Sequence, residues 1–521
     1  MKSSGWRAVL ALGLIFSTRL NVAHAEVSSY ISPEVLSTRA IFSRPCAKII
    51  YSSNRSGLVR PFVVDMKNPA QPKVSEIELS EPEDFVAQAL APDCRTLAMV
   101  ADRHGDGVFD VYLYDLENRS LRNITGTEES DEGKPVFAPR GHLLAYLANG
   151  YLALYDYAKG ARLAVAPTLK RFQSILWSED GESLYLDDEH GGIWQYDLKS
   201  SRAHKIWAPS TAGYSSHMIA ERHGRLLFVS NHETEVRQIY QFDPRDRSPK
   251  RLYPTQYDQF SPIEEAKGRY TFRTNIDGSF VAAQLRDGKY AALSPPTGVV
   301  YDFSLDFGAP LLLYSNDQLP IGLYWFEAGR LRPLLPASSG SHQPTAIPIK
   351  NAGGMTNFLY LPSSKPSAWL IWLHGGPHEQ VSPRYNLYFD FLARRNIAVY
   401  AINYPGSTGI GKTYELRDKG PEEKFGIQLS AIWPSAPRGI CQTAASRSAR
   451  SSLSQRTMPS RRVSRPSNAR EIGPKRRAKR WPEGSTEIGG KSSAERPALT
   501  LRSASETFVI SGSLSALRCS R

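Results

Sequence analysis

One of two glycine-rich segments in the second half of the chain carries residue types that can stabilise negative charge. The first, His374-Gly375-Gly376-Pro377, follows the apolar run 369–373. A strand that ends in such a turn presents backbone amides, which can donate hydrogen bonds to a developing oxyanion. The second segment is a loop over 403–411, with the candidate residues Asn403, Tyr404, Gly406, Ser407, Thr408, Gly409 and Gly411.

Short apolar runs around the two segments predict the elements that position them. Residues 358–362 and 369–373 are predicted strands, and the second is a continuous apolar run suited to burial in an α/β sheet. An amphipathic stretch over 388–395 and a further strand over 397–402 follow. The candidate oxyanion loop 374–377 is therefore expected at the carboxyl end of a sheet strand.

Together the two segments resemble the opening of the catalytic domain of the prolyl oligopeptidase family, which includes acylaminoacyl peptidases and dipeptidyl peptidases. Members of that family pair HGGP with a later NYRGSTGYG-like loop. The resemblance covers residues 27 to about 429, most clearly 355–426, although Pro405 and Ile410 replace an Arg and a Tyr that the family usually has. It implies hydrolysis of short peptides by a Ser/Asp/His triad behind a β-propeller, and it implies no cofactor.

A catalytic serine for this chemistry is not recognisable in the sequence. A triad needs a serine on a tight strand-to-helix elbow, usually GxSxG, and the 521 residues contain no GxSxG. Ser407 is interpreted as a loop residue of the NYRGSTG-like motif. His374 and His378 precede the expected nucleophile, whereas this fold places its base near the end of the domain. We therefore assign no catalytic residue and expect the chain to be inactive.

A repeat fills the region between residue 40 and about residue 345. Turns with a small or polar first residue are followed by apolar strands, and a second strand then ends in an Asp. A period in the forties with several strands per unit is typical of propeller blades, and the fragments resemble the repeats of TolB-like propellers. About seven units fit. The turns are 43–46, 91–94, 138–141, 178–181 and 221–224.

One hairpin of this region has acidic residues at spacings similar to those of a calcium loop. The residues are Asp102, Asp106 and Asp110. Carboxylates separated by glycines can wrap a hard cation, but the Glu that closes an EF-hand is missing. A Gly/Asp-rich hairpin between two strands is the favoured interpretation, so no metal is assigned.

The first 25 residues are predicted to be a cleavable export signal. They have a basic start at Lys2 and Arg7, an apolar run over 8–16 and the small-x-small end at 23–25. The apolar run is far shorter than the roughly 20 residues needed to span a bilayer. We therefore expect a periplasmic or secreted protein without a membrane span.

The net charge of +13 lies in the last part of the chain. Residues 430–521 hold 18 Lys and Arg, five Glu and no Asp, so the preceding part is formally neutral. Ser and Arg dominate that tail, and its apolar residues show no periodicity, so it is predicted to be disordered. The tail is not taken as a nucleic-acid site, because an exported protein seldom meets that partner. The abrupt change in composition suggests out-of-frame translation of an interrupted gene.

Cys46 and Cys94 are the two cysteines outside the tail. Export permits a bridge between them, but two free thiols in turns is the favoured interpretation, given the geometric demands of a disulfide.

The expected architecture is multidomain, β followed by α/β. It comprises a signal peptide (1–25), an about seven-bladed β-propeller (26–345), an incomplete α/β-hydrolase domain (346–429) and a disordered basic tail (430–521). The expected function is that of a serine peptidase acting on peptides, in a chain that is catalytically inactive. The alternative is a non-enzymatic propeller module that binds a peptide or protein in the cell envelope. The sequence indicates no oligomeric state.

Overall fold

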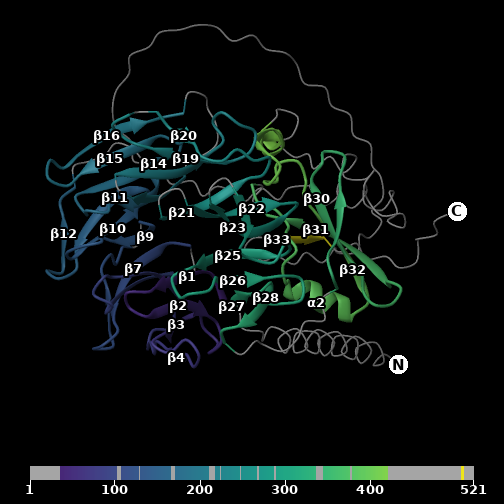
Figure 1. The fold of residues 1–521 in the computed structure, drawn as a ribbon. Coiled ribbons are helices and arrows are strands. Elements are labelled where there is room, and N and C mark those ends of the chain that lie inside the picture. The colour runs from purple at the N-terminus through teal and green to yellow at the C-terminus, as the bar shows by residue number, and fades with distance from the viewer. Residues whose placement is uncertain are drawn as a thin grey trace, which may run out of the picture.

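The computed structural model describes most of the chain up to residue 419 (Figure 1). The described residues are 36–102, 107–127, 130–165, 171–209, 217–222, 224–246, 248–266, 269–286, 289–335, 344–375, 378–419 and 506–509. The predicted signal peptide, most of the tail, Asp106, Gly376 and Pro377 lie outside them.

Up to Pro333 the chain forms antiparallel four-stranded meanders, in which neighbouring strands pair in chain order. The first two are β1 (Leu36–Ser43), β2 (Lys48–Ser53), β3 (Arg60–Asp65), β4 (Lys73–Glu76), then β5 (Phe85–Leu90), β6 (Thr96–Asp102), β7 (Phe109–Asp115), β8 (Ser120–Asn123). The next two are β9 (Glu132–Phe137), β10 (Leu143–Ala148), β11 (Tyr151–Asp156), β12 (Ala161–Leu163), then β13 (Phe172–Trp177), β14 (Ser183–Asp188), β15 (Ile193–Asp197), β16 (Arg202–Trp207).

Three further meanders follow, and the last two belong to one eight-stranded sheet. They are β17 (His217–Arg222), β18 (Arg225–Ser230), β19 (Gln238–Phe242), β20 (Lys250–Arg251), then β21 (Gln259–Ala266), β22 (Arg269–Ile276), β23 (Ser279–Arg286), β24 (Lys289–Ala292), and finally β25 (Val299–Ser304), β26 (Leu311–Ser315), β27 (Gly322–Glu327), β28 (Arg330–Pro333). The bridge between Phe280 and Val299 joins β23 to β25 in parallel. The described residues thus contain seven meanders.

The second strand of a meander is apolar on both faces because each meander packs against a neighbour on either side. Strands β6, β10 and β18 are buried along most of their length, whereas the outer strands β4, β12 and β24 are exposed. This burial explains the continuous apolar runs that define the repeat in the sequence.

The meanders pack in chain order, and the last packs against the first. Leu97 of the second meander shares an apolar cluster with Ile50 of the first. Five further clusters join the following meanders in turn. Leu311 of the seventh meander then shares a cluster with Ile49 of the first. The clusters therefore form a closed ring, and this mostly-sheet arrangement fits the predicted propeller.

The repeated turns connect the first and second strands of successive meanders. In four of the five turns the fourth residue has positive φ, between 59° and 76°; these residues are Cys94, Gly141, Gly181 and Gly224. In the fourth meander the Gly181 amide donates to the Ser178 carbonyl at 2.9 Å, which closes the turn. Glycine suits this position because positive φ costs it little.

Cys46 and Cys94 form a disulfide, so the favoured interpretation of two free thiols is wrong. Both residues lie in the repeated turn, one in the first meander and one in the second. The packing of these meanders brings the two turns together, with 5.3 Å between the Cα atoms. The bridge therefore staples two neighbouring meanders.

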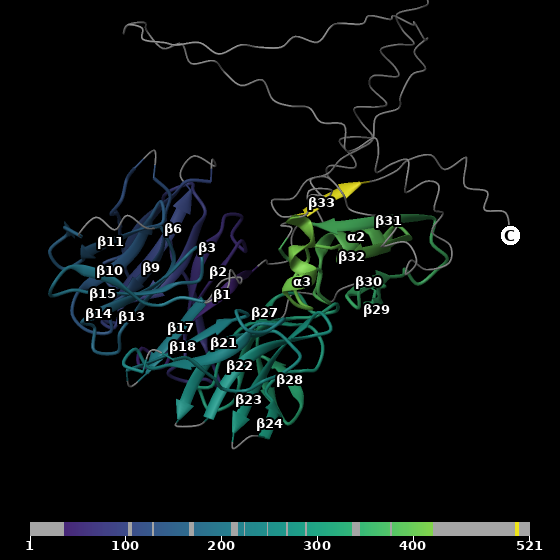
Figure 2. The same cartoon turned by 90° about the horizontal axis from the view of Figure 1, so that it is seen from above.

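The second part of the fold is a small sheet of order β29-β30-β32-β31-β33. It lies beside the sixth and seventh meanders (Figure 2). Strands β31 and β32 are parallel, and Asn386 caps helix α2 by accepting a hydrogen bond from the Tyr388 amide at 2.9 Å. Its elements are β29 (Ile347–Lys350), β30 (Thr356–Tyr360), β31 (Ala368–His374), α2 (Leu387–Arg394), β32 (Ile397–Ile402), α3 (Lys412–Glu415), the 3₁₀ helix η1 (Leu416–Lys419) and β33 (Glu506–Val509).

Strand β33 comes from the tail that the composition predicts to be disordered. It pairs antiparallel with β31 next to His374. Four residues of the tail are thus part of the sheet, and the other residues of 430–521 lie outside the described residues. Among the described residues, no helix combines the length and apolar character needed to cross a membrane.

Candidate functional site

His374, the last residue of β31, lies against Ser407 of the second glycine-rich loop. The imidazole Nε2 is 2.7 Å from Ser407 Oγ, and Nδ1 is 2.7 Å from the Gly375 carbonyl oxygen. A carbonyl can only accept, so Nδ1 carries the proton and Nε2 accepts from the serine hydroxyl. A side-chain hydrogen bond therefore ties the candidate oxyanion loop to the second loop.

The environment of His374 keeps its imidazole neutral. Burial lowers the pKa of His374 to about 4, and the positive charge of Arg384 also lowers it. The ring stacks on Tyr404 with 4.5 Å between ring centroids, and the Tyr404 hydroxyl donates to the His374 carbonyl at 2.7 Å. Tyr404 therefore holds the end of β31 through both the ring and the main chain.

A serine hydroxyl that donates to a neutral imidazole is the first half of a catalytic triad. Here Ser407 is fully buried, and the second ring nitrogen bonds a carbonyl in place of a carboxylate. An imidazole with a pKa of about 4 is also a poor base near neutral pH. The geometry therefore indicates that Ser407 and His374 hold the two loops together and do not act as a catalytic pair.

Asn403, the first residue of the second loop, connects that loop to two other segments. Its side-chain amide donates to the carbonyls of Thr356 and Val381, at 2.7 and 3.0 Å, and its oxygen accepts from the Val381 amide at 2.6 Å. Thr408 donates its amide to the Glu379 carbonyl at 2.9 Å. These bonds fix the loop to β30 and to the segment before α2.

The glycines of this loop allow the chain to approach the meanders. Gly406, Gly409 and Gly411 have positive φ, between 107° and 116°. A Cβ at Gly409 would lie 2.6 Å from Asn275 Nδ2, and one at Gly411 would lie 2.5 Å from Glu235 Cγ. Both neighbours belong to the meander region. Glycine is therefore required here by conformation and by close approach together.

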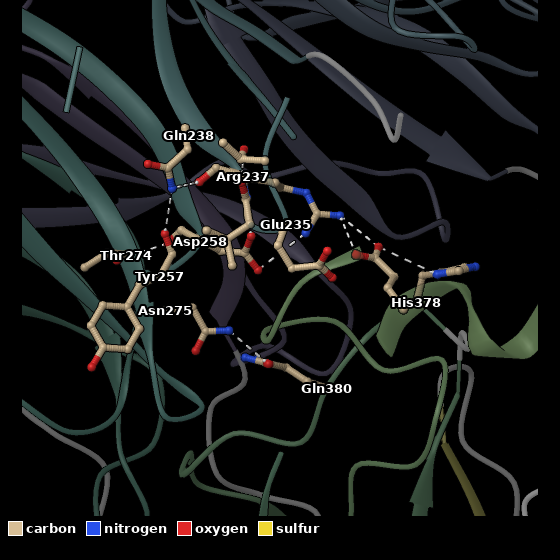
Figure 3. Close-up of polar contacts among 12 residues, drawn as sticks. Glu235, Arg237, Gln238, Tyr257, Asp258, Thr274, Asn275, His378 and Gln380 are labelled. Atoms are coloured by element: carbon tan, nitrogen blue, oxygen red, sulfur yellow. Dashed lines mark hydrogen bonds and ion pairs between the residues drawn. The ribbon is translucent and has the colours of Figure 1, made fainter. Parts of the chain in front are cut away.

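A buried ion cluster lies where the small sheet meets the meanders (Figure 3). We call Arg237, Asp258, His378 and Glu415 the Arg237 cluster. Arg237 donates through Nη2 to both oxygens of Glu415, at 2.8 and 3.1 Å, and its Nη1 lies 3.6 Å from Asp258 Oδ2. His378 Nδ1 is 3.7 Å from Glu415 Oε1. The cluster connects the residue after the candidate oxyanion loop to the meander region.

Burial dominates the electrostatics of this cluster. It raises the pKa of Asp258, although the charge of Arg237 acts in the opposite direction. One guanidinium faces two carboxylates, and the negative charges of Glu415 and Glu235 raise the pKa of Asp258 further. The Arg237 cluster is therefore a set of coupled groups.

Glu235 makes a second contact across the same boundary. Its carboxylate accepts from the Thr413 amide and, at 3.0 Å, from the Thr413 hydroxyl, while its carbonyl accepts from the Lys412 amide at 2.8 Å. Asn275 Nδ2 donates to Gln380 Oε1 at 3.0 Å (Figure 3). Sequence reasoning missed Glu235, Arg237 and Glu415, because no motif marks residues that meet only through tertiary packing.

The hairpin that resembles a calcium loop uses its carboxylates for hydrogen bonds within the protein. Asp110 accepts from the Thr125 hydroxyl at 2.8 Å and from Asn123 Nδ2 at 2.9 Å, and Asp102 accepts from the Gly107 amide at 2.9 Å. Asp106 lies outside the described residues. Within the part of the chain that is described, no group of three acidic, His or Cys side chains could hold a metal ion.

Comparison with known proteins points to one group of peptidases. No family model matches the chain. Dipeptidyl aminopeptidase BIII of Pseudoxanthomonas mexicana is 29% identical over 151 residues, which cover 25% of this chain and 22% of that protein. Dipeptidyl-peptidase 5 of Porphyromonas gingivalis is 22% identical over 242 residues, which cover 43% and 33%. The matched regions thus span a third or less of these curated relatives.

A peptidase of known structure has a similar fold. The acylaminoacyl peptidase of Pyrococcus horikoshii superposes with a TM-score of 0.57 at 15% identity, over 78% of this chain and 72% of that one. At this identity the likeness concerns the fold. The predicted resemblance to the prolyl oligopeptidase family is confirmed by these neighbours.

Proposed function

We propose that the chain derives from serine peptidases that hydrolyse short peptides, and that the 521-residue polypeptide does not hydrolyse them. In this proposal residues 26–345 form a seven-bladed propeller and residues 346–429 the opening of an α/β-hydrolase domain. The seven meanders and the closed ring of apolar clusters support the propeller. An acylaminoacyl peptidase with this fold was solved with Z-Gly-Gly-Phe-chloromethyl ketone, which supports a peptide as the ligand class.

The observation that carries the inactivity is the burial of Ser407 and Ser230, the two serines whose hydroxyls contact a histidine ring among the described residues. Ser407 is 0% exposed beside His374. Ser230 is 1% exposed, and its Oγ lies 3.0 Å from Nδ1 of His232. Covalent catalysis needs a hydroxyl that a substrate carbonyl can approach. Neither hydroxyl meets that requirement, so neither serves as a nucleophile.

Labelling with a fluorophosphonate probe tests this proposal. We expect no labelling of the purified full chain and no turnover of peptide p-nitroanilides, while an active prolyl oligopeptidase in the same assay is labelled and turns over. Labelling that disappears in Ser407→Ala or Ser230→Ala would overturn the proposal. It would also identify the nucleophile.

Export to an oxidising compartment is part of the proposal. The predicted signal at residues 1–25 motivates it, and the Cys46–Cys94 disulfide supports it, because such bridges persist mainly outside the cytosol. N-terminal sequencing of the protein from fractionated cells tests it. A mature start near residue 26 is expected, and an uncleaved cytosolic product would contradict it.

A non-enzymatic binding module is the second candidate function. It is favoured by a charged cavity among the first strands of the meanders, lined in part by Arg39, Arg273 and Asp302. Residues 26–345, immobilised and exposed to an envelope extract, should then retain a defined peptide or protein. Retention that persists after the cavity is blocked would place the binding elsewhere on the propeller.

A further inference from the structure

A polar cavity of about 470 Å³ lies among the first strands of the meanders. Neighbouring first strands contact one another around the ring, as β1 does with both β5 and β25. The cavity is therefore on the inner side of the ring of meanders. Its polar lining includes Thr38, Arg39, Gln88, Arg273, Tyr301 and Asp302.

Arg273 is held in the cavity wall by neutral groups. Its Nη1 donates to the Tyr301 carbonyl at 2.6 Å and to the Val300 carbonyl at 3.2 Å, and its Nη2 donates to Ser261 Oγ at 2.9 Å. Among the described residues its Nε, which is buried, has no hydrogen-bond partner. The guanidinium is thus fixed in place with no carboxylate within ion-pair distance among the described residues, although Asp302 is near enough for its charge to raise the pKa of Arg273.

Arg39 brings a second positive charge to the same cavity. Its side chain is exposed on the cavity, and it makes no ion pair with any described residue. Burial lowers the pKa of Arg273, the charge of Asp302 raises it, and the like charge of Arg39 lowers it, so the three charged groups lie within electrostatic reach of one another. Like charges that face a shared cavity are stabilised by an anion between them.

Asp302 does not neutralise both positive charges of the cavity. Burial raises the pKa of Asp302 by more than Arg273 and Arg39 lower it. The cavity therefore offers a ligand two cations and one carboxyl group.

We propose that this cavity binds a short peptide with free termini. Its carboxylate lies between Arg39 and Arg273, because planar guanidinium groups match carboxylates in geometry and charge. Its ammonium group lies at Asp302, which that contact keeps ionised. The volume suits a ligand of a few residues, since small-molecule pockets measure roughly 300–1,000 Å³. The inference deepens the binding-module candidate and is independent of the peptidase proposal.

Calorimetric titration of the full chain with tri-alanine tests this site. We expect saturable binding, and we expect affinity at least about tenfold lower for tri-alanine amide and for N-acetyl-tri-alanine, since each lacks one charged end. Arg39→Gln should weaken tri-alanine binding by at least about tenfold. Arg330→Gln is the matched control, because Arg330 is exposed on β28 outside the cavity and should leave binding unchanged.

Other variants and probes separate the alternatives. Thr38→Tyr fills the cavity without removing a charge and should abolish binding, which keeps the test valid if Arg39→Gln is poorly folded. Equal binding of tri-alanine and its amide, or no loss in either variant, overturns the proposal. Inorganic phosphate that competes with tri-alanine at similar concentration would show a general anion site and also overturn it. Retention of an envelope partner by the Thr38→Tyr variant would leave the binding module standing without this cavity.

Discussion

Arg237 and Glu415 are 178 positions apart in sequence, yet Arg237 Nη2 lies 2.8 Å from Glu415 Oε1 inside the protein. Their side chains are only 10% and 2% exposed. Arg237 follows β18 in the fifth meander, and Glu415 ends α3 just beyond the second glycine-rich loop. This pair is therefore a buried polar link between the two parts of the fold.

Replacement of Glu415 by Gln should destabilise the protein by about 3 kcal/mol, because it leaves Arg237 buried with a weaker partner. Urea unfolding at pH 7 measures the loss. The control is Glu117→Gln, which removes an ion pair with Arg95 at 3.0 Å whose Glu side chain is 70% exposed. Exposed pairs contribute under about 1 kcal/mol. Equal losses of free energy of unfolding in the two variants would show that the buried Arg237–Glu415 pair contributes no more than an exposed ion pair.

Acid should destabilise the protein through His374. Its pKa is lowered by burial from 6.5 to about 4 in the fold. The unfolded chain therefore takes up a proton below about pH 6.5 while the folded protein does not. The free energy of unfolding is therefore not reduced by His374 above pH 6.5, and it decreases as the pH falls from 6.5 toward 4. The decrease amounts to about 3 kcal/mol over that range by proton linkage.

The free energy of unfolding, measured from pH 7.5 to pH 4, tests this linkage. The wild type should lose about 3 kcal/mol more than His374→Gln over that range. His190→Gln is the control, since the side chain of His190 is 80% exposed. Parallel curves for the wild type and His374→Gln would show that His374 is protonated in the folded protein.

Loss of the Cys46–Cys94 bridge should lower the free energy of unfolding by about 4 kcal/mol, because the disulfide closes a loop with a sequence separation of 48. Thermal unfolding with and without reductant measures the effect. The double variant Cys46→Ala/Cys94→Ala should unfold like the reduced wild type and should not respond to reductant. A wild type that is indifferent to reductant would contradict the bridge.

The sequence predicts the strands around the candidate site well, because each is a short apolar run with turn residues on both sides. Residues 397–402 match β32 without error, and the predicted strand over 369–373 lies within Ala368–His374. The repeated turns are also recognisable, because positive φ selects Gly at their fourth position in several units. Local residue patterns therefore carry most of the architecture.

Contacts between distant segments are not accessible in the same way. Nothing near Ser407 indicates that its hydroxyl meets His374, and nothing near Arg237 indicates Glu415. These pairs exist because the second loop folds back over β31 and onto the meanders. The sequence does not predict the pairing of Cys46 with Cys94 for the same reason, since only the packing of two meanders brings the cysteine-bearing turns together.

Gly409 tests whether that loop must approach the meanders as closely as the structure shows. Its φ of +116° is unfavourable for other residues, and an added Cβ would collide with Gln380 Oε1 and lie 2.6 Å from Asn275 Nδ2. Gly308 is the matched control, because it has a φ of +101° and open space around an added Cβ. Gly308→Ala should cost about 1–2 kcal/mol from backbone strain alone.

Gly409→Ala should cost about 1–3 kcal/mol more than Gly308→Ala, because crowding is added to strain. Urea unfolding measures both variants. In a Gln380→Ala background the shorter side chain frees the space, so the extra cost of Gly409→Ala should shrink while that of Gly308→Ala stays constant. If the two glycine variants cost the same in both backgrounds, the loop does not press against Gln380 and Asn275. The boundary between the loop and the meanders would then be looser than the hydrogen bond between those two side chains implies.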